Sequence, residues 1–328
     1  MNTKAIDLAN IALMLLACVA AFAVPFEMFL FSYAVLGPLH YLTEIGWLHK
    51  RNYFATGKND YLLLIAFCVL LFMFTFIFTE HSRLATVFIF VAFFFSLGTV
   101  LFKNFFAKLG FVALAFVVGA AVQNAPSFVY LIGVFLPTLI HVFLFTGLFI
   151  LYGALKNKSV TGIASLVVFA VCAISFFLLH PNIEFYKVTA YAEKALQESG
   201  FIQLNKSIIE IFKLGQFTRE NVFESNTGLG IMRFIAFAYT YHYLNWFSKT
   251  QVIKWHEVPK NQLAFIVVLW ILSVALYAYD YYIGLVALYF LSMLHVLLEF
   301  PLNYRSVIGI GEEIGALAGW KKSAAKNG

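Results

Sequence analysis

The sequence predicts an all-α, polytopic membrane helix bundle of about ten transmembrane helices, and three observations lead to this prediction. Of the 328 residues, 62% are hydrophobic and 12% are charged, too little polar surface to cover a soluble globule of this size. The apolar runs are each about 17 to 25 residues long, which suits α-helices that cross roughly 30 Å of hydrocarbon. Runs such as LATVFIFVAFFFSLGTVLF are apolar on every face, which favours helices over the alternating strands of an outer-membrane barrel.

Taken in order along the chain, the apolar runs predict the individual spans. Only Pro25 separates the first two, so nine spans are the alternative if these two form one kinked element. The first run resembles a signal peptide weakly, but another hydrophobic run follows Pro25 directly, and we expect the first run to remain as a helix. The expected spans cover about residues 5–24, 26–48, 60–79, 84–102, 105–122, 128–155, 160–179, 230–248, 261–281 and 284–301.

One segment interrupts this hydrophobic pattern. Residues 180–229 have mixed charge, and the apolar residues between Ile208 and Leu214 are spaced as one face of a helix. We expect two or three short helices there, forming an extramembrane insertion on the outer side of one membrane domain that comprises residues 1–328. A structural cap is favoured over a binding domain, because the segment has no cluster of ligand-type residues.

The basic residues alternate between connections and predict the orientation. Lysine and arginine occur in every second connection and in the tail, residues 302–328, whereas the intervening connections are almost free of net positive charge. This positive-inside pattern places both termini in the cytoplasm, and we expect a bacterial inner membrane protein. The net charge of +6 then reflects topology and contact with membrane lipid. No basic patch with stacking aromatics suggests a nucleic-acid partner, and the oligomeric state stays open.

Four of the eight histidines lie inside predicted spans: His40, His141, His242 and His295. At about 1.5 Å per residue from the cytoplasmic end, His242 and His295 lie near 9 Å, His40 near 12 Å and His141 near 20 Å. Four helices that are distant in sequence therefore each place one imidazole in the inner half of the bilayer or near its midplane. Ionisable side chains are costly at such depths, so a group of them points to a functional site.

Two of these histidines are followed by a glutamate one helical turn later. His40 precedes Glu44, and His295 precedes Glu299, both at the i, i+4 spacing that puts two side chains on one helix face. Each pair could supply a nitrogen and an oxygen ligand, or a ligand with the group that orients it. Imidazole with carboxylate suits iron, zinc or copper, and open positions favour non-haem iron. We expect His40, His141, His242 and His295 to be metal ligands, and Glu44 and Glu299 to be ligands, supporting groups or catalytic residues.

Four further residues are candidates for contacts with a substrate. Tyr241 and Trp246 flank His242 and could line a cavity, although interfacial aromatics are the commoner explanation. Arg51 and Arg305 follow the two histidine–glutamate segments near the predicted cytoplasmic boundary and could hold a polar head group. The expected partner is a membrane lipid or another lipophilic small molecule that enters laterally from the bilayer.

Two short segments resemble a known family. VLGPLHYLTEI resembles the Pro-His-Gly motif, with an acid four residues past the histidine, of bacterial Brp/Blh-type carotenoid-cleaving dioxygenases, and YTYHYLNWF is similar to their later Tyr-His helix. The resemblance implies one iron ion held by four histidines, and it carries over to His40 and His242. The chain departs from the motifs at Tyr41, Glu44 and Trp246, which replace a glycine, an aspartate and a second histidine. The resemblance therefore supports a metal site more than carotene cleavage.

These features favour a metal-dependent membrane oxidoreductase, with non-haem iron as the expected metal, zinc or copper as alternatives and a lipophilic substrate. A proton-coupled transporter or channel is the second hypothesis, because the same histidines and glutamates could form a proton relay. A haem protein that uses a pair such as His141 and His242 as axial ligands ranks third.

Overall fold

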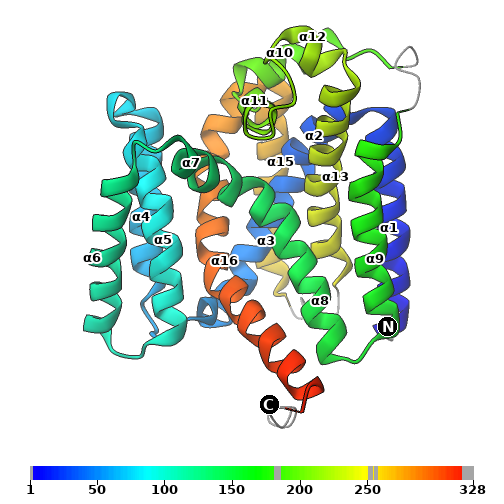
Figure 1. The fold of residues 1–328 in the computed structure, drawn as a ribbon. Helices are drawn as coiled ribbons and strands as arrows, with labels where there is room; N and C mark the ends of the chain where they lie inside the picture. Colours follow the sequence, from blue (N-terminus) through cyan, green and yellow to red (C-terminus); the bar gives the residue numbers. More distant parts are fainter. Residues whose placement is uncertain (1–2, 181–185, 250–253, 255–257, 320–328) are drawn as a thin grey trace. The chain divides into compact units, whose positions relative to one another are not determined.

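The computed structural model describes residues 3–180, 186–249, 254 and 258–319, and every regular element in this part of the chain is a helix (Figure 1). This confirms the predicted all-α fold class. Most of the helices begin and end close to the limits of the predicted apolar runs, because hydrophobic length sets both. The last helix is an exception, since it runs from Tyr281 to Leu317, well past the predicted end at 301 and into the predicted tail.

The chain divides into two compact units, which are described separately. Unit 1 consists mainly of Leu8–Glu44 and Val167–Ser292, and unit 2 mainly of Ile45–Leu166 and Met293–Gly328, together with Asn2–Asp7. Four helices contribute residues to both units: α1 (Thr3–Ala23), α3 (Gly37–His49), α9 (Val160–Leu178) and α16 (Tyr281–Leu317). The single membrane domain expected from the sequence stays a prediction.

The other helices belong to one unit each. Unit 1 contains α2 (Pro25–Phe31), the π-helical η1 (Ser32–Leu36), α10 (Ala190–Glu198), α11 (Ile202–Ile211), α12 (Arg219–Phe223), α13 (Asn226–Ser248) and α15 (Lys260–Tyr279). Unit 2 contains η2 (Asn52–Phe54), α4 (Tyr61–Phe76), η3 (Thr79–His81), α5 (Arg83–Leu101), α6 (Phe105–Val122), α7 (Pro126–Phe128), the π-helical η4 (Val129–Phe145) and α8 (Thr146–Lys156).

Seven stretches of the described chain are long and apolar enough to cross a membrane: Thr3–Ala23, Arg83–Leu101, Phe105–Val122, Pro126–Lys156, Val160–Leu178, Lys260–Tyr279 and Tyr281–Leu317. They indicate a membrane protein. The expected count of about ten is not confirmed by length and composition, since α4 is apolar but shorter, η1 separates α2 from α3, and α13 carries many polar side chains. The bacterial inner membrane and the orientation of the termini stay predictions.

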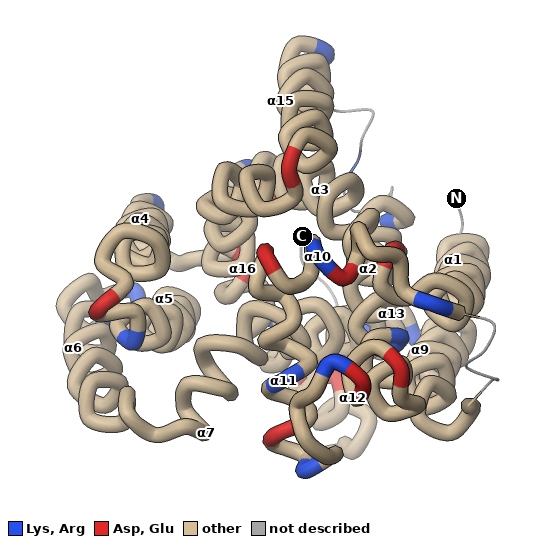
Figure 2. The backbone as a smooth tube through the Cα atoms, turned by 90° about the horizontal axis from the view of Figure 1, so that it is seen from above, with Lys and Arg blue, Asp and Glu red and all other residues tan. Residues whose placement is uncertain are grey.

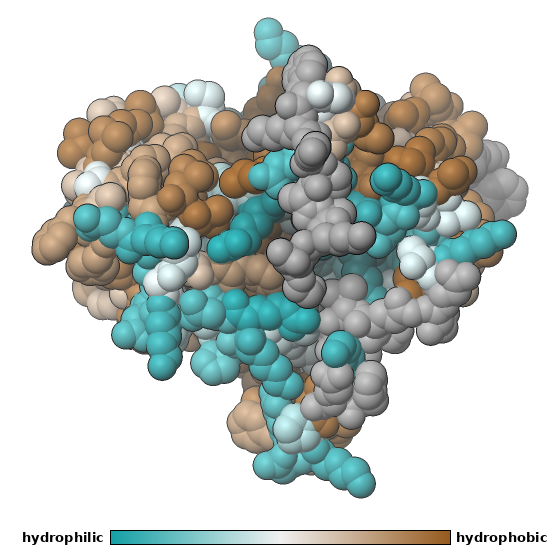
Figure 3. Space-filling model, turned by 90° about the horizontal axis from the view of Figure 1, so that it is seen from below, coloured by the Kyte–Doolittle hydropathy of each residue, from teal (hydrophilic) through white to brown (hydrophobic). Residues whose placement is uncertain are grey.

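The expected insertion contains three short helices, α10, α11 and α12, in its described part. Residues 181–185 of this segment, and residues 320–328 of the predicted tail, lie outside the described residues. Arg219 connects α12 to α10 by donating to both carboxylate oxygens of Glu193 at 2.6 Å. Seen from above, charged residues gather over α11 and α12 (Figure 2). On the face seen from below, both hydrophilic and hydrophobic residues are exposed among the described residues (Figure 3).

Helix α13 forms much of the core of unit 1. Most of its residues are buried, and it packs against α2 and η1. Two hydroxyl groups, Ser32 Oγ and Thr240 Oγ1, are hydrogen bonded at 2.6 Å across this contact. Phe29 meets Tyr239 edge to face, with ring centroids 5.1 Å apart. Small polar residues at a helix contact satisfy one another where lipid offers no hydrogen bonds, so they fix how α13 faces η1.

Unit 2 contains a buried ion pair within its apolar helices. Helices α4, α5 and α6 lie side by side (Figure 1). Lys108 Nζ, in α6, donates to Asp60 Oδ2 at 2.6 Å, and the Gly57 backbone N–H donates to the same oxygen at 2.9 Å. Both charged side chains are buried. Each charge therefore offsets the cost of desolvating the other. The pair joins the start of α4 to α6.

Two prolines occur inside helices of unit 2 without ending them. Pro137 lies within η4, and Pro301 lies within the continuous α16. A proline lacks the N–H that an α-helix uses and crowds the preceding turn, so π geometry around Pro137 relieves this conflict. His141 lies in the same π-helix, whose wider turns change the direction of its side chain relative to an ideal α-helix.

The turn after α3 is conformationally strained. Asn52, Tyr53 and Phe54 have φ values of 49°, 51° and 57°, a region that costs non-glycine residues about 1–3 kcal/mol each. His49 Nδ1 and the Tyr53 hydroxyl are hydrogen bonded at 3.1 Å, and Arg305 Nε donates to the Phe54 carbonyl at 2.5 Å. Burial raises the pKa of the Tyr53 phenol, which therefore stays neutral. These contacts stabilise the strained turn.

Candidate metal centre

His40 and His242 meet because α3 and α13 approach each other closely in unit 1. A side chain at Gly37 would bring its Cβ to 3.3 Å from the Tyr243 hydroxyl, so the absence of one permits the approach. Further along both helices, Trp246 Nε1 of α13 donates to Thr43 Oγ1 of α3 at 3.0 Å. These two contacts lie on either side of His40 in sequence and direct its imidazole toward α13.

The two imidazoles form a buried pair. His40 Nε2 and His242 Nε2 are 3.1 Å apart, and the rings meet edge to face with centroids 4.7 Å apart. The side chains are 1% and 6% exposed. In this arrangement, one nitrogen can donate a hydrogen bond to the other, or both can bind a shared cation.

Glu44 completes the polar group of unit 1. Its Oε2 lies 3.0 Å from His40 Nε2, as the i, i+4 spacing predicts, and the carboxylate is buried. The geometry of this contact is not that of a hydrogen bond, and Glu44 Oε2 has no hydrogen-bond partner among the described residues. His40 Nε2 therefore has an imidazole nitrogen on one neighbour and a carboxylate oxygen on another, each at about the distance that separates ligand atoms around one ion.

Unit 2 contains a second buried group of the same residue types. His141 Nδ1 lies 3.4 Å from Glu299 Oε2, and the rings of His141 and His295 are 5.2 Å apart between centroids. All three side chains are buried. The sequence pairs Glu299 with His295 by spacing, which stays a prediction, and the structure adds a contact with His141, which is 158 residues away in the chain.

The described residues thus include histidines that could hold a metal. His40, His242 and His295 are three buried histidines, each of which offers a ring nitrogen, and together they could hold a transition-metal ion. His295 lies in α16, three residues beyond Ser292, where this helix leaves unit 1. The ligand types do not determine which metal is bound.

The four candidate substrate residues have these contacts. The Trp246 indole lies edge-on to the His40 ring at 5.5 Å between centroids. Tyr241 donates to Asn10 Oδ1 at 3.2 Å and stacks on Phe237, on the side of α13 that faces α1. In unit 2, the Arg51 guanidinium lies 4.2 Å from the centre of the Trp47 ring, and Arg305 donates to the Phe54 carbonyl. Whether any of them contacts a substrate stays a prediction.

Sequence reasoning missed Thr43 as a neighbour of the histidines and did not place Tyr243 beside His40. The Tyr243 ring lies 5.2 Å from that of His40 and 5.5 Å from that of His242. Thr43 accepts the Trp246 indole N–H and donates to the His40 carbonyl at 2.8 Å. Both residues are adjacent in sequence to a candidate ligand, but only the crossing of α3 and α13 brings them onto the same side of the site.

Comparisons of the chain with protein-family models, with curated proteins and with solved structures find no match.

Proposed function

We propose that this protein is a metal-dependent membrane oxidoreductase that uses non-haem iron and acts on a lipophilic substrate. His40, His242 and His295 are the proposed ligands, with His141 as a fourth. Glu44 and Glu299 bind the ion directly or orient the imidazoles. The buried pair of His40 and His242, with Glu44 beside it, is the observation that carries the proposal.

The distances within this group are those of ligands that share an ion. Two nitrogens at about 2.0–2.1 Å from one metal lie about 2.9 Å apart at an octahedral angle and about 3.4 Å apart at a tetrahedral angle. The separation of 3.1 Å between the Nε2 atoms of His40 and His242 falls within this interval. Axial ligands on opposite faces of a haem would be about 4 Å apart, so this pair fits a non-haem ion better.

The chemistry of the donor set favours a redox metal with open positions. Two imidazoles and one carboxylate, which His40, His242 and Glu44 supply, are typical of non-haem iron enzymes that leave positions free for co-substrates. When bound, such an ion would supply the redox chemistry, and the chain would hold and orient it and exclude water. The buried carboxylates of Glu44 and Glu299 are costly in an apolar surrounding, and a divalent cation would offset that cost.

Metal analysis of the purified protein tests the proposal. We expect near-stoichiometric iron in the wild-type protein in detergent and its loss in a folded His40→Ala/His242→Ala variant. His81→Ala/His180→Ala is the matched control, because both of its histidines are exposed, and it should keep the metal. An absorption spectrum of the same samples would reveal haem by its Soret band.

A proton-coupled transporter is the second candidate, because both units bury a histidine beside a glutamate. His40 lies 3.0 Å from Glu44, and His141 lies 3.4 Å from Glu299. Such pairs could exchange a proton. Wild-type protein that holds no iron, zinc or copper after loading, but supports a pH-dependent flux in vesicles, would exclude the oxidoreductase and favour the transporter.

A further inference from the structure

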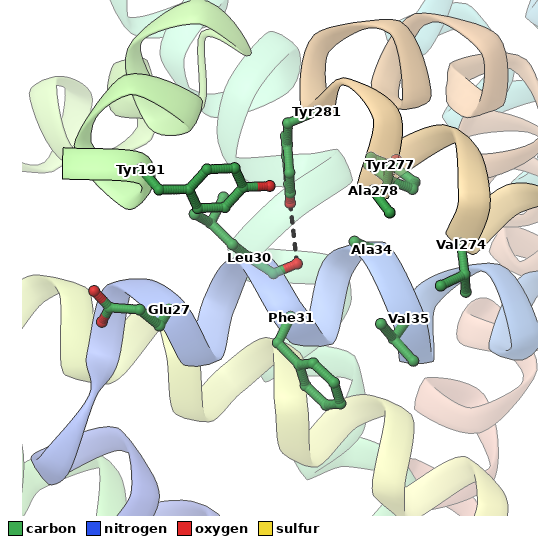
Figure 4. Close-up of a pocket in the computed structure, with 10 residues that line it drawn as sticks. All are labelled: Glu27, Leu30, Phe31, Ala34, Val35, Tyr191, Val274, Tyr277, Ala278 and Tyr281. Carbon is green, nitrogen blue, oxygen red and sulfur yellow. Dashed lines mark hydrogen bonds between the residues drawn. The ribbon is translucent and has the colours of Figure 1, made fainter. Parts of the chain in front are cut away.

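Unit 1 contains a cavity of about 250 Å³ between α2, η1, α10, α15 and the start of α16 (Figure 4). Leu30, Phe31 and Ala34 form one wall, and Val274 and Tyr277 of α15 form the facing wall. Pockets that enclose a drug-sized ligand measure about 300–1,000 Å³, so this cavity would hold one end of a larger molecule.

The cavity lies beside a surface that suits lipid. Only 17% of the most apolar stretch of α15 is buried, and this helix exposes Phe265, Val268 and Ile271. Phe31, at the edge of the cavity, is 58% exposed. Because these side chains are apolar, we expect them to face acyl chains, and a molecule dissolved in the bilayer could reach the cavity without crossing water.

The charge around the cavity restricts what it can bind. Glu27, at the end opposite Val274 (Figure 4), accepts hydrogen bonds from the Tyr186 hydroxyl at 2.7 Å and from Thr189 N and Oγ1 at 3.0 and 2.9 Å. Burial, followed by the Glu27 carboxylate, raises the pKa of Tyr186, which keeps this donor protonated. The carboxylate is therefore held as an anion without a ligand, and it would repel a carboxylate or phosphate head group.

A chain of tyrosine rings leads from this cavity to the histidine pair within unit 1. Tyr277 lines the cavity, and its ring lies 6.4 Å from that of Tyr33, which lies 6.0 Å from that of Tyr239. Tyr239 is 6.3 Å from Tyr243, and Tyr243 is 5.2 Å from His40, again between centroids. A packed aromatic core therefore joins the cavity to the proposed ligands.

We propose that this cavity binds one end of an uncharged lipophilic molecule that carries a hydroxyl or carbonyl group. Apolar side chains contact its hydrocarbon part. The hydroxyl of Tyr191, which extends over the cavity in Figure 4, donates to its oxygen. That this molecule is the substrate rests on the proposed function. That the cavity binds it does not depend on the proposed function.

Quenching of tryptophan fluorescence by a brominated probe tests the binding. Trp270 Nε1 donates to the carbonyl of Val35, a residue of the cavity wall, at 2.8 Å, so Trp270 reports on this site. The probe is a dibrominated long-chain alcohol, compared with the dibrominated fatty acid of equal length, and the protein is the full chain in nanodiscs. The signal of Trp270 is the difference between the fluorescence of the wild-type protein and that of the Trp270→Phe variant.

Two phenylalanine substitutions on α15 provide the variant and its control. Ala278→Phe places a ring in the cavity, whereas Ala275→Phe, on the same helix, places it outside. We expect saturable quenching by the alcohol in wild type and in Ala275→Phe, and binding weaker by about tenfold or more in Ala278→Phe. Equal quenching in both variants, or fatty acid binding as tight as that of the alcohol, would overturn the proposal.

The assay separates this proposal from the proposed function. It is run on protein treated with a chelator, so the result does not depend on the metal. Selective binding by a protein that never holds metal would support the cavity proposal and contradict the oxidoreductase. If the protein holds metal but Ala278→Phe does not weaken binding of the alcohol, the result would contradict the cavity proposal and leave the oxidoreductase supported.

Discussion

At the scale of single residues, Glu44 decides how the buried histidines are interpreted. Its spacing from His40 shows only that both side chains can share a helix face. The contact at 3.0 Å places the buried carboxylate against the imidazole nitrogen of His40, which itself lies beside His242. The carboxylate charge should therefore matter to a bound cation.

Glu44→Gln is expected to lower the metal affinity by about 10- to 100-fold, the usual effect of removing a group that supports or completes a metal site. Glutamine keeps the shape of the side chain but removes the charge. Competition with a chelator of known affinity measures the change, with Glu80→Gln, an exposed glutamate of η3, as the control. Unchanged affinity would assign Glu44 to packing alone.

Local contacts also explain some residues that the sequence suggests for substrate binding. Arg305 is engaged by the carbonyl of the strained turn at Phe54, and Tyr241 by Asn10. Both are candidates because they lie near a histidine in the sequence, but nearness in sequence does not show the direction of a side chain. Trp246 does face His40, because Thr43 accepts its indole N–H.

At the scale of helices, the Asp60–Lys108 pair connects two apolar helices of unit 2, α4 and α6. Removing one member of a buried ion pair leaves an uncompensated charge and costs about 3–5 kcal/mol, whereas replacing both by apolar residues is often neutral. The positions lie at the start of α4 and in the second turn of α6. A change at one helix should therefore be suppressed by a change at the other.

We expect Asp60→Leu to lower the unfolding free energy of the protein in detergent by about 3–5 kcal/mol, and Asp60→Leu/Lys108→Met to restore most of it. Thermal unfolding of wild type, both single variants and the double variant forms the complete cycle. Additive losses in the double variant would show that the two side chains do not interact.

At the scale of the whole molecule, orientation in the membrane is the main open prediction. The lysine and arginine distribution places both termini in the cytoplasm with about ten spans. The seven long apolar helices agree with a membrane protein, but a count of helices does not show which end of each faces the cytoplasm.

Reporter fusions at successive connections can determine this orientation. A reporter that is active only in the cytoplasm should be active after Lys158, because that connection carries the basic residues Lys156 and Lys158. It should be inactive after Asn124, because the connection QNAPS carries no basic residue. Equal activity at both positions would mean that the intervening helix, Pro126–Lys156, does not cross the membrane.

Hydropathy and residue spacing alone predict most of the helices, the approximate limits of most of them and the contact between His40 and Glu44, but not the continuation of α16 to Leu317. These features depend on the local composition of the chain and on the helical repeat, which a short segment contains completely. They also select the buried histidines, because ionisable residues are rare within apolar runs.

Tertiary packing alone decides which residues meet across the bundle. His40 contacts His242, which is 202 residues away in the chain, Glu299 contacts His141, and Lys108, within an apolar run, contacts Asp60. Each contact depends on the rotation of one helix about its axis relative to another. That rotation is determined by close packing, by residues such as Gly37 and by the π-helical turns, and helices that are apolar on every face contain little information about it.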